Sequence, residues 1–178
     1  AGWGIPSLSI KINQSPSTYR ADARQAGIPN FASTLEAIQH SVARMQSPNA
    51  LVELEQASKA LRLELSQLVP QVFIFTSIGG MSGSGLLADI AELLKSTTSA
   101  SWARAAVSFL YTPDVFNSIP YSQPSLIANA LGTMNELIAS RFVGLSEKSK
   151  ALYSKFGISP QGFESEYGCD TYILVGAR

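Results

Sequence analysis

Residues 72–87 read VFIFTSIGGMSGSGLL, and this stretch decides the fold of the chain. The residues from Val72 to Phe75 are β-branched or aromatic, which is typical of a buried strand. Beyond the glycines, apolar residues recur at helical spacing, with Asp89, Glu92 and Lys95 expected on the opposite, solvent side of the helix. The stretch therefore predicts a strand, a glycine-rich turn and a helix whose apolar positions are Leu86, Leu87, Ile90, Leu93 and Leu94.

The turn has the composition of an anion-binding loop. Glycines permit positive φ and let a backbone approach a ligand closely. The first N–H groups of the following helix are unpaired donors at the positive end of its dipole. We therefore expect a phosphate to contact the backbone amides from Met81 to Gly85 and the hydroxyls of Ser82 and Ser84. A side chain at Gly83 is expected to fill the phosphate position. The predicted site comprises Gly79, Gly80, Met81, Ser82, Gly83, Ser84 and Gly85.

Two common phosphate-binding motifs can be compared with this turn. The lysine-bearing P-loop is excluded, because Leu86 stands where that motif requires lysine. Gly83, Gly85 and Ala88 satisfy the dinucleotide pattern G-x-G-x-x-G/A. The first acidic residue beyond the next predicted strand is Asp114, which lies later than the usual interval of about 20 residues. A Rossmann-type dinucleotide-binding domain therefore stays open as an alternative.

The whole turn resembles GGGTGSG, the signature of tubulin and of the bacterial cell-division tubulin. Met81 replaces a glycine and Ser82 replaces the threonine. The order of the predicted elements agrees with that family: a second strand over residues 106–111, a proline-containing loop, a helix over residues 124–138 and a third strand over residues 172–175. The run YTPDVF at residues 111–116 is similar to divergent bacterial tubulin-like proteins. The resemblance covers about residues 70–178, and residues 1–69 only loosely.

The resemblance implies a filament-forming, cytoplasmic, cytoskeletal GTPase. The ligand would be GTP or GDP, with Mg²⁺ when the triphosphate is bound, and copies of the protein would form an oligomer or polymer through head-to-tail contacts. Asp114 matches the acid with which tubulins contact the ribose. The family's guanine-binding Asn stands at the end of the third strand, where this chain reads Gly176-Ala177-Arg178, so the base contact is not assigned. The acid that activates hydrolysis belongs to a second domain of the next subunit, so no catalytic residue is assigned in this chain. A structural tubulin-fold subunit without nucleotide turnover stays open.

The predicted fold class is α/β, with one domain over residues 1–178. Strands that alternate with helices favour a mostly parallel sheet in three layers, and ligands of such sheets bind beyond the carboxyl ends of the strands. The glycine turn and Asp114 both follow strands, so both are expected at that edge. As the resemblance implies, the domain would be an incomplete nucleotide-binding domain, an interior piece whose second domain belongs to the remainder of the polypeptide.

The amino-acid composition indicates that part of the apolar surface is covered by other chain segments or subunits, and it excludes several classes of partner. Charged residues make up 15% of the chain, below the roughly 25% of an ordinary domain, so further chain or subunits are expected to cover apolar area. The net charge is zero without a basic cluster, so no nucleic-acid partner is expected. No apolar run reaches the ~20 residues of a membrane span. No metal site is predicted, because His40 is interpreted as a surface residue and Cys169 as an inert buried one.

The remaining segments are predicted as scaffold. Alternating residues over 8–12 suggest a strand, and residues 13–18 form a polar loop that the resemblance matches to a phosphate-sensing loop, although an ordinary solvated loop stays open. Ser33 to Glu36 has the pattern of a capping box that starts a helix. A further helix is expected from Pro48 to Pro70, with its apolar side buried, and a short amphipathic helix over residues 146–156.

Overall fold

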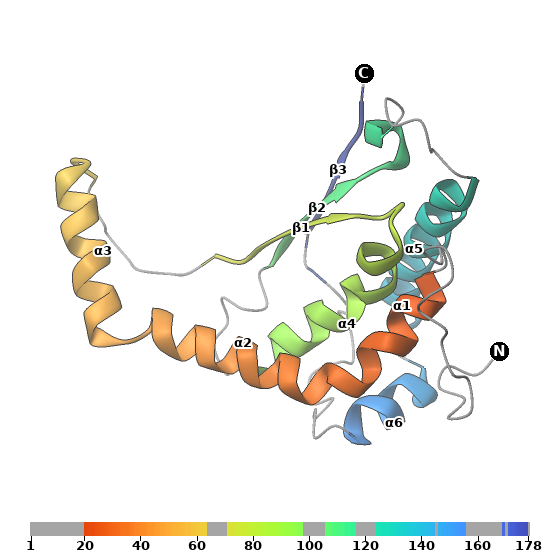
Figure 1. Cartoon of the computed structure of the whole chain (residues 1–178), viewed down its shortest axis with the longest axis horizontal. Helices are drawn as coiled ribbons and strands as arrows, with labels where there is room; N and C mark the ends of the chain where they lie inside the picture. Colours follow the sequence, from red (N-terminus) through yellow and green to blue (C-terminus); the bar gives the residue numbers. More distant parts are fainter. Residues whose placement is uncertain are drawn as a thin grey trace.

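The computed structural model of the chain describes residues 20–63, 71–97, 106–116, 124–144, 146–155, 169 and 171–177. The predicted strand at residues 8–12 and the loop at 13–18 lie outside these ranges. Figure 1 shows the arrangement of the elements. In chain order they are α1 (Arg20–Gly27), η1 (Ile28–Asn30), α2 (Phe31–Met45), α3 (Pro48–Ala60), β1 (Phe73–Ser77), α4 (Met81–Thr97), β2 (Val107–Tyr111), η3 (Pro113–Phe116), α5 (Pro124–Val143), α6 (Glu147–Lys155) and β3 (Thr171–Val175).

The described strands form one parallel sheet in the order β1-β2-β3. The register pairs Phe75 with Phe109 and Phe109 with Ile173. Parallel strands need crossover connections, and here α4 links β1 to β2 while α5 and α6 lie between β2 and β3. The predicted α/β class with a parallel sheet is therefore confirmed, and all three strands end at the same edge.

The two faces of the sheet differ in their environment. On one face, Ile78, Leu110 and Leu137 are buried in a cluster that joins the sheet to α4 and α5. Figure 1 shows these helices, with α1 and α6 beyond them, on one side of the sheet. On the other face, Phe75 is 62% exposed and stacks on Phe109 with ring centroids 4.8 Å apart. No described helix covers Phe75, so the described part of the chain contains two of the three expected layers.

Two acidic residues of α4 occupy positions that differ from the prediction. Asp89 and Glu92 were expected on the solvent side of this helix, but both side chains are fully buried. Asp89 is buried because α1 packs along α4 and Tyr153 of α6 contacts this carboxyl group, so the side of α4 that carries Asp89 is covered as well. Helical periodicity locates the apolar side of a helix. It does not show whether other helices cover the polar side.

The N-terminal helices also depart from the predicted boundaries. The capping box at Ser33 is not formed, because α2 begins earlier, at Phe31, with Asn30 as N-cap and the Ser33 hydroxyl donating to the Asn30 carbonyl. Phe31 is buried against Tyr153, which draws the helix start into the core. The predicted start of α3 is confirmed, since Ser47 accepts a hydrogen bond from the Ala50 N–H.

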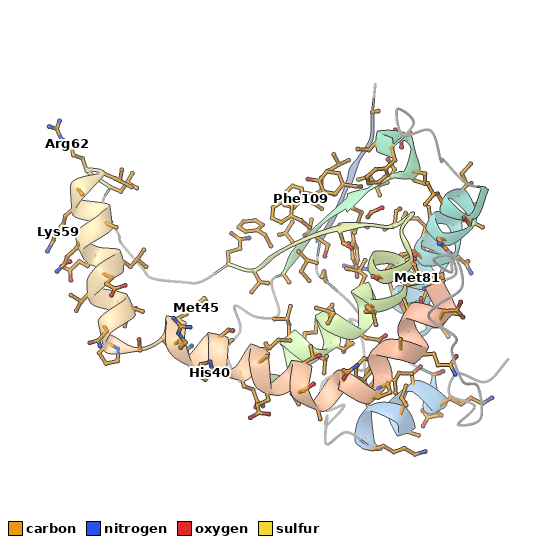
Figure 2. All side chains as sticks on the ribbon, viewed as in Figure 1. His40, Met45, Lys59, Arg62, Met81 and Phe109 are labelled. Atoms are coloured by element: carbon orange, nitrogen blue, oxygen red, sulfur yellow. The ribbon has the colours of Figure 1, made fainter. Side chains whose placement is uncertain are left out.

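α3 ends at Ala60, well before Pro70. Shortly after it, Arg62 has a φ of 55°, which ends the helical conformation. The side of α3 that was expected to be buried is exposed, and Leu61, the residue after the helix, is 70% exposed. Figure 2 shows α3 extending away from the sheet. The predicted continuation through Leu65 and Leu68 lies outside the described residues.

α5 starts at Pro124, as expected for a proline suited to the first turn of a helix. Its buried side combines Ala130 and Leu137 with the polar residues Asn129 and Thr133. Three of the apolar residues that predicted this helix are instead exposed: Ile127, Leu131 and Ile138. The start of α6 is capped by the Ser146 hydroxyl, which accepts a hydrogen bond from the Ser149 N–H.

Candidate functional site

The glycine-rich turn and Asp114 lie at the carboxyl edge of the sheet. Residues 78–80 connect β1 to α4, and α4 begins at Met81, so Ser82 to Gly85 form the start of the helix rather than a loop before it. Asp114 lies in η3, which follows β2. This is the edge at which open parallel sheets bind their ligands.

The helix start limits the backbone donors to three. Ser84 N–H donates to Gly80 O at 3.1 Å and so enters the helical hydrogen-bond pattern, as does Gly85 one residue later. The N–H groups of Met81, Ser82 and Gly83 come before the first helical hydrogen bond, so helix geometry leaves them without an intrahelical acceptor. The predicted set of donors from Met81 to Gly85 is therefore reduced to these three.

The two serine hydroxyls have different surroundings. Ser82 is exposed at the first turn of the helix. Ser84 is 2% exposed, and its hydroxyl donates to Met81 O at 3.1 Å within the same turn. The expected phosphate contact from the Ser84 hydroxyl is corrected accordingly, because that hydroxyl is turned into the protein. Ser82 is the hydroxyl that the structure leaves on the surface.

Gly83 and Gly85 are required by packing. A Cβ atom at Gly83 would lie 2.2 Å from Ser77 O and 2.3 Å from Thr76 Oγ1, so α4 sits directly on the end of β1. A Cβ atom at Gly85 would lie 2.3 Å from Arg20 O in α1. Among the glycines of the described ranges, positive φ occurs at Gly144 and not in this turn. The expectation that a side chain at Gly83 would fill the phosphate position is therefore wrong, since it would meet β1.

The first two glycines of the turn are less confined. At Gly80, the nearest atom to an added Cβ is Ser77 Oγ at 3.8 Å, which is an ordinary contact. At Gly79, an added Cβ would be 3.3 Å from Pro113 Cγ and 3.4 Å from Leu126 Cβ. Gly79 thus fits tightly between η3 and α5, whereas a side chain at Gly80 would make only ordinary contacts with Ser77.

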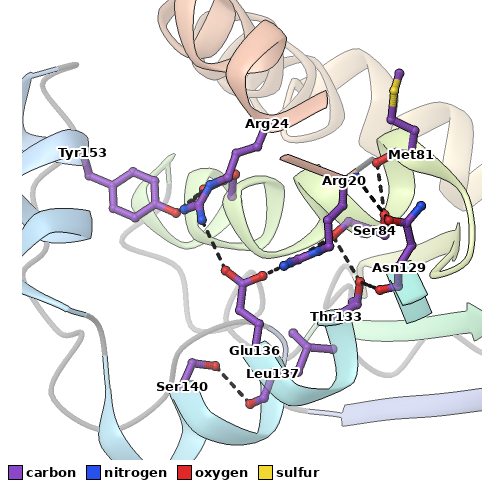
Figure 3. A network of polar contacts seen from close by, with 11 residues as sticks. Arg20, Arg24, Met81, Ser84, Asn129, Thr133, Glu136, Leu137, Ser140 and Tyr153 are labelled. Atoms are coloured by element: carbon purple, nitrogen blue, oxygen red, sulfur yellow. Dashed lines mark hydrogen bonds and ion pairs between the residues drawn. The ribbon is translucent and has the colours of Figure 1, made fainter. Parts of the chain in front are cut away.

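A polar network behind the turn holds its carbonyl groups (Figure 3). Asn129 Nδ2 donates to Gly79 O at 3.1 Å, and the Thr133 hydroxyl shares its proton between Asn129 O at 2.9 Å and Ser84 O at 3.3 Å. Arg20 donates to Ser84 O from Nε at 3.3 Å, and its guanidinium also forms an ion pair with Glu136. No role was expected from the sequence for Asn129, Thr133 or Glu136. The available signal was the recurrence of the polar residues Asn129, Thr133 and Glu136 at helical spacing along α5.

A buried ion pair continues this network along α4. Arg24 Nη2 lies 2.9 Å from Asp89 Oδ1, and Tyr153 donates to the same oxygen at 2.5 Å. Arg24 Nη1 also contacts Glu136 Oε1 at 3.2 Å. Burial raises the pKa of the Asp89 carboxyl, and the Arg24 charge and the Tyr153 hydrogen bond oppose this effect. The cluster therefore joins α1, α4, α5 and α6 around one fully buried carboxyl group.

Asp114 connects the loop after β2 to the end of β3. Its Oδ2 accepts the Ala177 N–H at 2.6 Å, and a hydrogen bond with Thr112 is the main reason that its pKa is lowered. The adjacent Gly176 permits this contact, because an added Cβ would lie 2.9 Å from Asp114 Oδ2. The carboxylate is thus oriented at the sheet edge, on the same side of the molecule as the glycine turn.

The described ranges contain no candidate metal site and no candidate membrane span. No group of three or more His, Cys, Asp or Glu side chains there is arranged to hold a metal ion. None of the described helices combines the length and the apolar character that crossing a membrane requires. Cys169 is buried, and its sulfur accepts a hydrogen bond from the Ser108 hydroxyl at 2.8 Å.

Comparison with known proteins gives one family assignment. The model of the family described as "Tubulin like" matches residues 3–177. No curated protein and no solved structure matched the chain. The family match extends the resemblance from the region after residue 70 to nearly the whole sequence, including the helices α1 to α3. Together with the parallel sheet and the glycine turn that opens α4, it shows that the chain belongs to the tubulin-like family.

Proposed function

We propose that this chain binds the phosphates of a guanine nucleotide, GTP or GDP, at the start of α4. The observation that carries the proposal is the set of three N–H donors of Met81, Ser82 and Gly83 at the carboxyl edge of the sheet, in a chain of the tubulin-like family. The positive end of the α4 dipole favours negative charge at the same place. The exposed Ser82 hydroxyl would add a fourth donor.

The other predicted site residues have supporting roles in this proposal. Gly79 lets the turn fit between η3 and α5, and Gly83 and Gly85 let α4 pack closely on β1 and α1, while Gly80 has only ordinary contacts. Ser84 contributes through its carbonyl, which anchors the turn to α1 and α5. Asp114 is the proposed ribose contact, with the Ala177 N–H fixing the direction of its carboxylate.

A divalent cation fits this site only together with the nucleotide. No described cluster of acidic or histidine side chains would hold it alone. Mg²⁺ commonly keeps several waters and binds through substrate phosphates with few protein ligands. We therefore propose that Mg²⁺ enters with GTP. Its charge would offset the triphosphate, and the backbone donors of α4 would orient the phosphates.

We further propose that the protein assembles head to tail into cytoplasmic filaments with copies of itself. Family membership supports this proposal. Large exposed apolar side chains on α5 and on the open sheet face also support it, because exposed patches of this kind mark contact surfaces. Sedimentation with and without GTP tests it: nucleotide-dependent pelleting is expected, and pelleting that ignores nucleotide would indicate a structural subunit.

The binding proposal is tested with a fluorescent GTP analogue and unlabelled GTP, GDP, ATP and NAD as competitors. Displacement by GTP and GDP is expected, whereas displacement by NAD would indicate a dinucleotide site instead. The informative variant is Ser82→Glu, with Ser82→Gln as its uncharged control. Glu at the first turn stabilises a helix through the dipole, yet it places a negative charge among the phosphate donors.

The two readouts of Ser82→Glu should therefore move in opposite directions. The melting temperature should stay equal or rise, while the affinity for GTP should fall by about tenfold or more. Ser82→Gln should change either value far less. Equal GTP affinity in Ser82→Glu and the unmodified protein would mean that phosphate does not bind at the start of α4.

A further inference from the structure

One side chain joins the glycine turn to both helices behind it. Asn129 is 4% exposed; its Nδ2 donates to Gly79 O at 3.1 Å and its Oδ1 accepts the Arg20 N–H at 3.2 Å. Figure 3 shows it between Arg20 and the start of α4. Asn129 thus binds the first residue of α1 and the turn at once, from its own position in α5.

The Asn129 bond acts on a peptide group that is held by hydrogen bonds at both of its polar ends. The Gly79 carbonyl and the Gly80 N–H belong to one planar peptide unit. Asn129 holds the carbonyl end, and the Ser77 hydroxyl accepts the Gly80 N–H at 3.2 Å at the other end. Packing is close at Gly79, where an added Cβ would lie 3.3 Å from Pro113 Cγ, and looser at Gly80, where the nearest atom is 3.8 Å away. The two hydrogen bonds therefore set the orientation of this peptide.

The orientation of this peptide decides where the next donors point. Met81, Ser82 and Gly83 follow it directly, and their N–H groups are the donors assigned to phosphate above. We propose that Asn129 is a positioning residue for nucleotide binding, which holds the Gly79–Gly80 peptide so that these three donors converge. This inference rests on the proposed function of the same site.

The test uses Asn129→Asp in the full protein. The aspartate keeps an acceptor for the Arg20 N–H but places an oxygen against Gly79 O, so the carbonyl loses its donor. GTP should bind about tenfold more weakly. The control is Ser140→Ala, on the same buried side of α5, whose hydroxyl donates to Leu137 O in its own helix. That variant should bind GTP normally.

A second readout separates positioning from general destabilisation. Residue-resolved hydrogen exchange should show faster exchange of the Gly80 amide in Asn129→Asp, with the amides in the middle of α4 unchanged. Ser77→Ala removes the other restraint on the same peptide. It tests the inference even where Asn129→Asp fails to fold, and it too should weaken GTP binding and speed Gly80 exchange.

The outcomes distinguish the two proposals. Absence of GTP binding in the unmodified protein would overturn the proposed function, while Gly80 exchange would still report on the restraint. Normal GTP binding by both Asn129→Asp and Ser77→Ala, in an unmodified protein that binds GTP, would overturn the positioning role alone. Protection of the Gly80 amide that is unchanged in both variants would contradict it as well.

Discussion

Two successive turns of α4 contact α1 in opposite ways. At the first, Gly85 presents no side chain, and an added Cβ would lie 2.3 Å from Arg20 O. At the second, Asp89 forms a buried ion pair with Arg24, with the two atoms 2.9 Å apart. Both contacts pair residues four apart on one helix with residues four apart on the other. The same interface therefore changes from backbone packing to buried charge within one turn.

The difference shows that the two contacts depend on each other. The absence of a side chain at Gly85 lets α1 come close enough to cover α4, and this coverage removes Asp89 from solvent. Arg24 then becomes necessary, because a buried carboxylate without a partner is costly. At the glycine contact, steric overlap determines which residues are tolerated. At the charged contact, the free-energy cost of desolvating the two partners determines it. These two kinds of contact predict different responses to substitution.

The largest effect is expected from Asp89→Ala. It breaks the buried ion pair with Arg24, whose guanidinium also contacts the partly exposed Glu136. Removing one partner of a buried pair costs about 3–5 kcal/mol, so the free energy of unfolding measured in urea should fall by an amount near this range. Replacing both partners, Arg24→Met with Asp89→Leu, should recover most of the loss. A double variant as unstable as Asp89→Ala would contradict the ion-pair explanation.

An intermediate effect is expected at the packed glycines. Gly83→Ala and Gly85→Ala place a Cβ within 2.3 Å of backbone atoms of β1 and α1. Overpacking of this kind costs about 1–3 kcal/mol, which thermal and urea unfolding will measure. Gly80→Ala is the matched control, because its Cβ would meet nothing closer than 3.8 Å. Equal stability of all three variants would show that α4 shifts to accommodate a methyl group.

The smallest effect is a pair of opposite pH dependences. The raised pKa of Asp89 means that the folded state binds its proton more tightly, so its stabilising contribution is complete below the ordinary value of 3.8 and is lost as the pH rises through the raised pKa. The lowered pKa of Asp114 has the reverse consequence: its contribution is present above 3.8 and is lost as the pH falls through the lowered pKa.

Comparing Asp89→Asn and Asp114→Asn with the unmodified protein measures how the stability contribution of each carboxyl group changes with pH. Urea unfolding across pH 3 to 8, a range chosen to include the ordinary carboxyl pKa, is sufficient. The free energy of unfolding of the unmodified protein, minus that of Asp89→Asn, should fall as the pH rises. The same difference taken with Asp114→Asn should increase as the pH rises. Two differences with the same sign would show that burial does not control the titration of Asp89.

Much of the fold was predictable from local patterns. The strand before the glycines, the helix after them, the proline at the start of α5 and the parallel sheet all follow from periodicity and turn chemistry, which are properties of neighbouring residues. The glycine turn and Asp114 were placed at the right edge for the same reason. The boundaries were less predictable: α2 begins two residues before Ser33 because Phe31 packs on Tyr153, more than a hundred residues away.

The sequence by itself determined the α/β class, the position of the glycine turn and the resemblance to the tubulin-like family. These depend on hydrophobic spacing and on a local motif. Only the tertiary structure decided which N–H groups remain donors, why Gly83 and Gly85 carry no side chain, and that Asn129 and Arg24 stand behind the turn. Such facts depend on how closely α1 and α5 approach α4, and contacts between distant segments leave no periodic signal along the chain.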